Sequence, residues 1–259
     1  MLFVGIDLAW SAKNNTGLAV IKGDERGAKL SGAGITVSDD SILDYVRKNV
    51  GSADALVAID APLVVPNKAG RRPADTLVSE LFRKYDAGAY PANRTRLGAW
   101  CNGKVRGEEL VVRFERAGFS HSPYIKRFEH SRKVFEVYPH PAMVAVFELN
   151  HILRYKSKPG RDGGFRVREF AKYEQLLKGL SRADPRVDVG KGLLLGKKLS
   201  GFSTSEMKRH EDTLDAVFCA YTAYYCWARP EKCAVLGSMK GGYILTPVLD
   251  SMHGTQTTL

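Results

Sequence analysis

Long hydrophobic runs are absent from this sequence of 259 residues. No stretch approaches the roughly 20 consecutive apolar residues that a membrane-spanning helix needs. The N-terminus has no basic segment ahead of its first apolar run and no small-residue cleavage site, both of which mark secretory signal peptides. We therefore expect a cytoplasmic protein that does not cross a membrane.

Cysteine is also scarce, with four residues in the chain, namely Cys101, Cys219, Cys226 and Cys233. None of them forms a Cys-x-x-Cys pair, which argues against a zinc ribbon. Cys219 and Cys226 fall in an apolar, helical segment, where cysteine usually serves as a small core residue. This usage favours reduced thiols, as in a cytoplasmic protein.

Acidic residues are fewer than basic ones. The chain has 39 Lys and Arg against 28 Asp and Glu, a formal net charge of +11. A surface with this excess attracts polyanions, of which nucleic acid is the commonest. A basic composition that serves solubility alone would look the same, so charge favours a nucleic-acid partner without requiring one.

The hydrophobic pattern predicts an α/β protein. Three strands joined by short turns form an antiparallel meander, at residues 2–6, 17–22 and 29–37. After a helix at residues 41–50, two further apolar strands of the buried, parallel kind follow at residues 55–59 and 134–138. Later helices are expected at residues 142–149, 166–180 and 212–227.

We expect a single domain over residues 1–259, with an insertion at approximately residues 65–124. Proline, glycine and arginine punctuate that stretch, which has room for short helices near residues 75–85 and 108–117. Its basic residues are expected to face the functional site.

Aspartates close two of the predicted strands. Asp7 ends the first strand and Asp60 ends the strand at residues 55–59. Asp212 and Asp215 lie three apart at the expected start of the last helix, where they share a face and the helix dipole favours them. Asp7 alone has a simpler interpretation, as the cap of the turn that follows it.

Carboxylates that gather at one edge of a sheet repel one another and need divalent metal ions to remain ionised together. The sequence therefore predicts Mg²⁺ or Mn²⁺ held by Asp7, Asp60, Asp212 and Asp215. Two such ions about 3.5–4 Å apart can activate a water and stabilise the leaving oxygen of a phosphodiester. Together with the basic surface, this pattern indicates a metal-dependent nuclease.

Several other side chains are candidates for the same site. His210, next to the aspartate pair, is a possible acid–base group or a helix cap, and His140 is a weaker acid–base candidate. Glu136 either completes the metal site or pairs with an arginine.

A basic loop at residues 154–161 provides the expected phosphate contacts, Lys156, Lys158 and Arg161. Solvated surface charge is the alternative interpretation of this loop.

Four segments carry a family resemblance: residues 5–10 (GIDLAW), 58–63 (AIDAPL), 136–142 (EVYPHPA) and 211–216 (EDTLDA). They resemble the signatures of the domain-of-unknown-function 429 family, which is described as predicted nucleases of ribonuclease H fold. The late Asp-x-x-Asp-Ala also resembles Holliday-junction resolvases of that superfamily, in which the matching carboxylates bind the metals. Asp60 stands where the resolvases carry a glutamate.

The resemblance implies a ribonuclease H-like mixed sheet, antiparallel in its first three strands and parallel afterwards, flanked by helices. It also implies a nuclease that acts on DNA or RNA. Two alternatives remain. One is a nucleic-acid-binding protein with an inactive site. The other is an actin-like phosphotransferase, against which the chain lacks a glycine-rich phosphate-binding turn after a strand in its second half.

Overall fold

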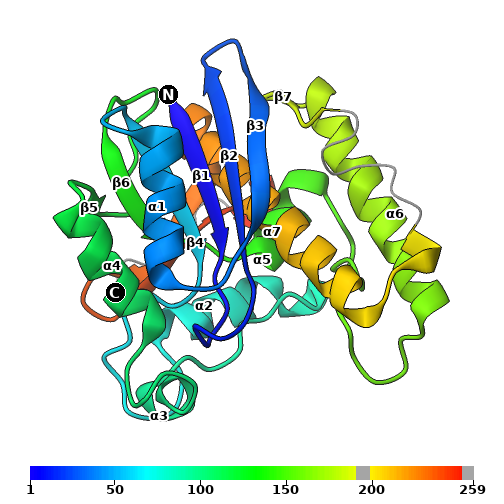
Figure 1. Cartoon of the computed structure of the whole chain (residues 1–259), viewed down its shortest axis with the longest axis horizontal. Helices are drawn as coiled ribbons and strands as arrows, with labels where there is room; N and C mark the ends of the chain where they lie inside the picture. The colour runs from blue at the N-terminus through cyan, green and yellow to red at the C-terminus, as the bar shows by residue number, and fades with distance from the viewer. Residues whose placement is uncertain (191–198, 253–259) are drawn as a thin grey trace.

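A seven-stranded mixed sheet forms the centre of the computed structural model, which describes residues 1–190 and 199–252 (Figure 1). Its order is β5-β6-β4-β1-β2-β3-β7. The strands are β1 (Leu2–Asp7), β2 (Thr16–Asp24), β3 (Gly27–Thr36), β4 (Ala55–Asp60), β5 (Ser120–His121), β6 (Arg132–Glu136) and β7 (Val187–Asp188). β1, β2 and β3 pair antiparallel, whereas β4 is parallel to β1 and β6 is parallel to β4. The predicted α/β class and mixed sheet are thus confirmed, and the arrangement is consistent with a ribonuclease H-like fold.

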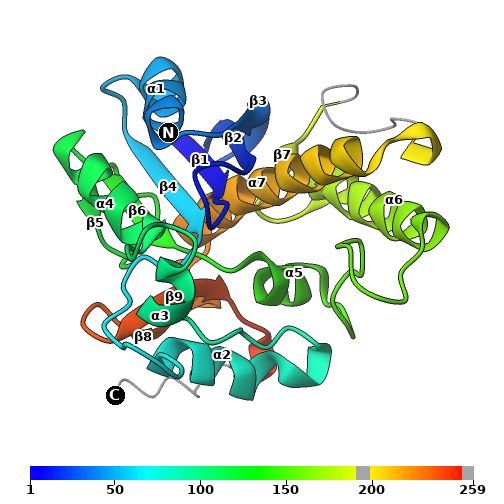
Figure 2. The same cartoon turned by 60° about the horizontal axis from the view of Figure 1, so that its bottom comes forward.

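Helices cover both faces of this sheet (Figure 2). The α-helices of the described residues are α1 (Asp39–Val50), α2 (Pro73–Phe82), α3 (Arg94–Gly98), α4 (Arg106–Arg116), α5 (Pro139–Phe147), α6 (Gly163–Gly179) and α7 (Thr204–Ala228). Successive residues of a strand point to opposite faces. Phe3 therefore joins a core with α7, while Val4 and Ile6 join a second core with α1 and α4.

A small hairpin stands beside the main sheet. It comprises β8 (Cys233–Ser238) and β9 (Gly242–Pro247), and it packs with α2 and α5 around a third core. An isolated bridge between Val137 and Leu245 joins it to the chain just after β6. The sequence analysis did not predict this hairpin.

The stretch predicted as an insertion connects β4 to β6 and contains α2, α3 and α4. Within the described residues, no helix has both the length and the apolar character to cross a membrane. Five single-turn 3₁₀ helices complete the described elements, at Arg83–Tyr85, Leu180–Arg182, Leu199–Gly201, Pro230–Lys232 and Asp250–Met252.

Most predicted elements agree with the structure to within three residues at each end, but the start of α7 does not. The helix begins at Thr204, eight residues before the predicted start at Asp212. Ser203 and Glu206 form a capping box there, each side chain accepting a hydrogen bond from the backbone N–H of the other residue. Asp212 and Asp215 therefore lie beyond the second turn, and the prediction that the helix dipole stabilises them was wrong.

Two glycines let the backbone of α7 approach the sheet closely. A Cβ on Gly5 of β1 would lie 1.9 Å from the carbonyl oxygen of Ala216, and a Cβ on Gly17 of β2 would lie 1.9 Å from that of Asp212. Both distances are far below a van der Waals contact. Because these two positions have no side chain, the turn of α7 that contains Asp212 can lie directly beside the end of β1.

Gly5→Ala should consequently lower the free energy of unfolding by about 3 kcal/mol, because the new methyl group meets rigid backbone rather than a movable side chain. Gly34→Ala in β3 is the matched control, since a Cβ there meets no atom within 4 Å. The control should be neutral or gain up to about 1 kcal/mol. Urea-induced unfolding of both variants measures the difference, and equal effects would contradict the close packing of α7 on β1.

Candidate functional site

Four aspartates from three elements meet at the end of the sheet, at the carboxyl ends of β1 and β4 and on the facing side of α7. They are Asp7, Asp60, Asp212 and Asp215, the carboxylate cluster below. Asp7 and Asp60 are direct partners in the parallel register of β1 and β4. The sequence-based expectation that these two strand ends are neighbours is therefore confirmed.

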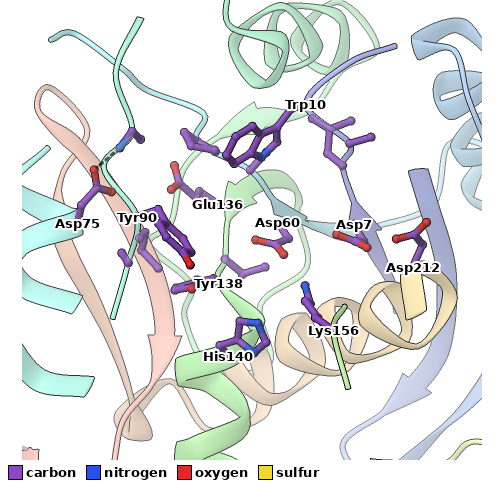
Figure 3. Close-up of a pocket in the computed structure, with 18 of the residues that line it drawn as sticks. Asp7, Trp10, Asp60, Asp75, Tyr90, Glu136, Tyr138, His140, Lys156 and Asp212 are labelled. Carbon is purple, nitrogen blue, oxygen red and sulfur yellow. Dashed lines mark hydrogen bonds between the residues drawn. The ribbon is translucent and has the colours of Figure 1, made fainter. Parts of the chain in front are cut away.

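The carboxylate cluster borders a cavity of about 750 Å³. Figure 3 shows Asp7, Asp60 and Asp212 side by side along its wall, with Lys156 facing them. Asp215 lies beneath this layer and is fully buried. The cluster therefore has three members that a ligand in the cavity can reach and one that supports them from below.

Asp215 is held by three donors. The Tyr155 hydroxyl donates a hydrogen bond to its Oδ1 at 2.6 Å and the Tyr173 hydroxyl donates another at 3.3 Å. The Lys156 ammonium lies 2.9 Å from its Oδ2. Because these neighbours fix its orientation, Asp215 holds the Lys156 ammonium at the wall of the cavity.

Two lysines offset the negative charge of the cluster. Lys156, with 29% of its side chain exposed, pairs with Asp215. Lys208 lies 2.7 Å from Asp212 Oδ1 and 2.6 Å from Glu211 Oε1. Across residues 1–190 and 199–252, no three His, Cys, Asp or Glu side chains converge where they could hold a metal ion.

Burial and mutual repulsion raise the pKa values of the three aspartates that border the cavity. The pKa of Asp7 lies well above its ordinary value because the group is desolvated and Asp215 is nearby. Burial, partly offset by Lys156, raises the pKa of Asp60 to about 7. Desolvation also raises the pKa of Asp212, while Lys208 and a hydrogen bond with Asp7 act in the opposite direction. A cation that entered the cavity would relieve this unfavourable arrangement.

Although no three of these carboxylates converge on one point, the cavity offers a divalent cation one or two carboxylate ligands. When ionised, the four carboxylates exceed the two lysines by two negative charges, and Asp212 Oδ2 is a buried oxygen without a hydrogen-bond partner. Mg²⁺ at phosphate-processing sites takes one or two carboxylates, with waters and substrate oxygens as its other ligands. Asp7 and Asp212, with Asp60 beside them, are the side chains that would hold it.

The raised pKa of Asp60 predicts a pH dependence of stability. The unfolded chain releases the Asp60 proton near 3.8, whereas the folded, metal-free protein keeps it to about 7. Between these values the folded state binds more protons, so its free energy of unfolding falls as the pH rises. Thermal melts across this range should show a weaker fall for Asp60→Asn than for the parent. Identical pH profiles would contradict the raised pKa.

Glu136 pairs with an arginine, which was one of the two interpretations left open by the sequence. Arg72 lies 2.6 Å from Glu136 Oε1 and 2.9 Å from Asp75 Oδ1, and all three side chains are buried. The backbone N–H of Leu63 also donates to Glu136 at 2.8 Å. With its oxygens occupied in this way, Glu136 borders the cavity as part of an ion-pair network.

The two histidine candidates lie in different places. His210 is buried, with its Nε2 3.1 Å from Glu174 Oε1, and it does not border the cavity. His140 does border it, and its Nδ1 has no hydrogen-bond partner. Burial and Lys156 lower the pKa of His140 to about 3, so its ring is neutral at physiological pH. The structure thus favours His140 over His210 as a group that can contact a ligand.

The three predicted phosphate contacts of the basic loop, Lys156, Lys158 and Arg161, lie in different surroundings. Lys156 turns inward to the carboxylate cluster, and the Arg161 guanidinium donates to the backbone carbonyl of Lys156 at 3.0 Å. Lys158 stays exposed at the cavity, 3.5 Å from the Tyr90 hydroxyl. Lys158 is therefore the member of this loop that is best placed for a phosphate, while Arg161 shapes the loop.

Sequence reasoning missed several side chains of the site. The ion pair of Lys208 with Asp212 could have been predicted, because residues four apart on a helix are neighbours. That prediction requires the helix to start at Thr204, before Lys208. No sequence pattern indicated the contacts of Tyr155 and Tyr173 with Asp215, since these contacts depend on how the loop and α6 pack. The same holds for the cavity wall formed by Trp10, Tyr90 and Trp100.

Comparison with known proteins identifies a family for this chain. No curated protein matched the chain. The model of one family, described as "Protein of unknown function (DUF429)", matches residues 5–238, a range that includes all four members of the carboxylate cluster. The chain, which is covered by that model over most of its length, belongs to the DUF429 family.

Proposed function

We propose that this protein hydrolyses phosphodiester bonds of nucleic acid, DNA or RNA, with a divalent cation held by the carboxylate cluster. The observation that carries the proposal is the meeting of Asp7, Asp60 and Asp212 on one cavity wall, where the carboxylates, when ionised, exceed the charge of the neighbouring lysines. When bound, Mg²⁺ or Mn²⁺ would activate a water and stabilise the leaving oxygen.

The other side chains of the cavity have roles that follow from their positions. Asp215, with its tyrosine partners, holds the Lys156 ammonium where it can face a substrate phosphate and stabilise negative charge as it develops. His140 offers a neutral ring nitrogen without a partner, which can hydrogen-bond a water or a leaving oxygen. Exposed Lys158 and the net charge of +11 would attract the polyanionic strand.

A cytoplasmic location accompanies this proposal. The four cysteines are free thiols, and Cys226 and Cys233 approach to 3.3 Å between sulfurs without a disulfide. Reduced thiols and a nucleic-acid substrate both suit the cytoplasm.

An inactive, nucleic-acid-binding protein is the second candidate, and one observation favours it. Lys156 and Lys208 lie within ion-pair distance of the cluster, where their ammonium groups already compensate part of the charge that a metal would neutralise. Such a protein would bind strands but would not cleave them.

A cleavage screen separates the two candidates. The substrates are single strands, duplexes, RNA–DNA hybrids, flaps and four-way junctions, each with Mg²⁺, with Mn²⁺ or with chelator. The nuclease proposal expects cleavage of at least one substrate that requires metal and is lost in Asp7→Asn. Binding without cleavage under every condition would support the inactive protein instead.

A further inference from the structure

Three of the four large exposed aromatic side chains in the described part of the chain line the cavity. Among the described residues, six large hydrophobic side chains are exposed, and three of them are aromatic residues that line this one cavity. Their exposed fractions are 41% for Trp10, 61% for Tyr90 and 56% for Trp100. Large aromatic rings are costly to leave in water, so their collection around one opening points to a ligand that covers them.

Cations alternate with these rings. The Arg96 guanidinium lies 5.2 Å from the Trp10 ring centroid and 5.5 Å from that of Tyr90. Lys158 Nζ lies 5.9 Å from the Tyr90 centroid, and the Trp10 and Trp100 rings meet edge to face at 6.5 Å. Trp10, Tyr90, Arg96, Trp100 and Lys158 form the aromatic rim below. Figure 3 shows Trp10 and Tyr90 on either side of the space that Asp60 faces.

We infer that the aromatic rim binds unpaired nucleobases, so that the proposed substrate is a single strand or a nucleotide turned out of a duplex. Flat aromatic and guanidinium surfaces stack on bases of any sequence, and interleaved cations follow the phosphates. This inference rests on the proposed function for the identity of its ligand as nucleic acid, but it concerns binding rather than cleavage.

The depth of the carboxylate cluster supports the same conclusion. Asp212 is only 2% exposed, and the cavity of about 750 Å³ is of the size that encloses a small ligand. A base-paired nucleotide is held inside a duplex and must be extruded before it can enter such a pocket. A phosphate would therefore approach the cluster most readily when its own base has left the helix and stacks on the rim.

The test is binding by fluorescence anisotropy in chelator, which prevents metal-dependent cleavage. The probes are single strands of DNA and of RNA, an abasic strand of equal length, and a blunt duplex. The parent should bind base-bearing strands at least about fivefold more tightly than the abasic strand, because each stacked base contributes from about fivefold to about 140-fold in affinity. It should also prefer the single strand to the duplex.

Trp10→Ala, Trp100→Ala and Tyr90→Ala should each remove most of this preference and leave affinity for the abasic strand unchanged. Tyr124→Ala is the matched control for Tyr90→Ala, because Tyr124 is 59% exposed and lies outside the cavity. Equal binding of base-bearing and abasic strands, no binding, or no effect of the rim variants would overturn the inference. Base-dependent binding without cleavage in the metal screen would support the aromatic rim as a base-binding surface and reject the nuclease proposal. Cleavage without base-dependent binding would support the nuclease proposal and reject the role of the rim.

Discussion

Replacing Arg72 with methionine should lower the free energy of unfolding by about 3–5 kcal/mol, because a buried ion pair that loses one partner leaves an uncompensated charge. The Arg72 guanidinium is the cation shared by Glu136 and Asp75, and each of the three side chains is at most 3% exposed. Methionine fills much of the space but neutralises neither carboxylate. Urea-induced unfolding at neutral pH measures the loss.

Arg47→Met is the matched control for that experiment. Arg47 and Asp44 also form an ion pair, at 3.0 Å, but their side chains are 73% and 71% exposed. Its removal should change stability by no more than about 1 kcal/mol. Adding Glu136→Gln to Arg72→Met should recover part of the loss, since burial already raises the pKa of Glu136 and the amide has no charge to bury. Similar losses in both single variants would contradict the buried network.

Asp7→Asn should reduce metal-dependent cleavage by about 10³-fold or more, since the charge stabilisation supplied by a bound metal is worth several kcal/mol in the transition state. The substituted asparagine would keep the shape of the side chain but lose the negative charge beside Asp60 and Asp212. Binding of strands in chelator should persist, because the aromatic rim is untouched. Initial cleavage rates and anisotropy on one substrate measure the two effects.

Asp44→Asn, on the exposed face of α1, controls for the loss of one negative charge at a distance from the cavity and should cleave like the parent. Cleavage by Asp7→Asn at the parental rate would remove Asp7 from the proposed site. Loss of strand binding in Asp7→Asn would show instead that the substitution disturbs the fold.

The strands and the helix that carry the aspartates of this site were predictable because they depend on local sequence patterns. Apolar runs closed by Asp7 and by Asp60 indicated two buried strands, and the carboxyl ends of parallel neighbours meet at one edge of a sheet. The placement of Asp212 near them was expected from the order of the elements and from the family resemblance. Even the true start of that helix was encoded locally, in the Ser203–Glu206 capping box, which the sequence analysis overlooked.

The contacts of the side chains around these aspartates were not predictable from local sequence patterns. Net charge identifies a basic loop but not the direction of each lysine, so the ion pair between Lys156 and Asp215 was not foreseen. Trp10 and Trp100 are far apart in the sequence and meet only through the long connection between β4 and β6. His210 was favoured by its position beside Asp212, yet successive residues of a helix point in different directions, and its ring faces Glu174.

The central claim is that the carboxylate cluster binds a divalent cation, and thermal melts of the parent and Asp7→Asn with and without Mg²⁺ or Mn²⁺ test it most directly. Without metal, Asp7→Asn should be at least as stable as the parent, because it removes a carboxylate whose pKa is raised by burial and by repulsion from Asp215. With metal, the parent should gain about 2.7 kcal/mol at a concentration a hundred times the Kd, and the variant should gain less. A parent that shows no metal-dependent shift, together with a strongly destabilised Asp7→Asn, would contradict the account and make Asp7 a structural turn cap.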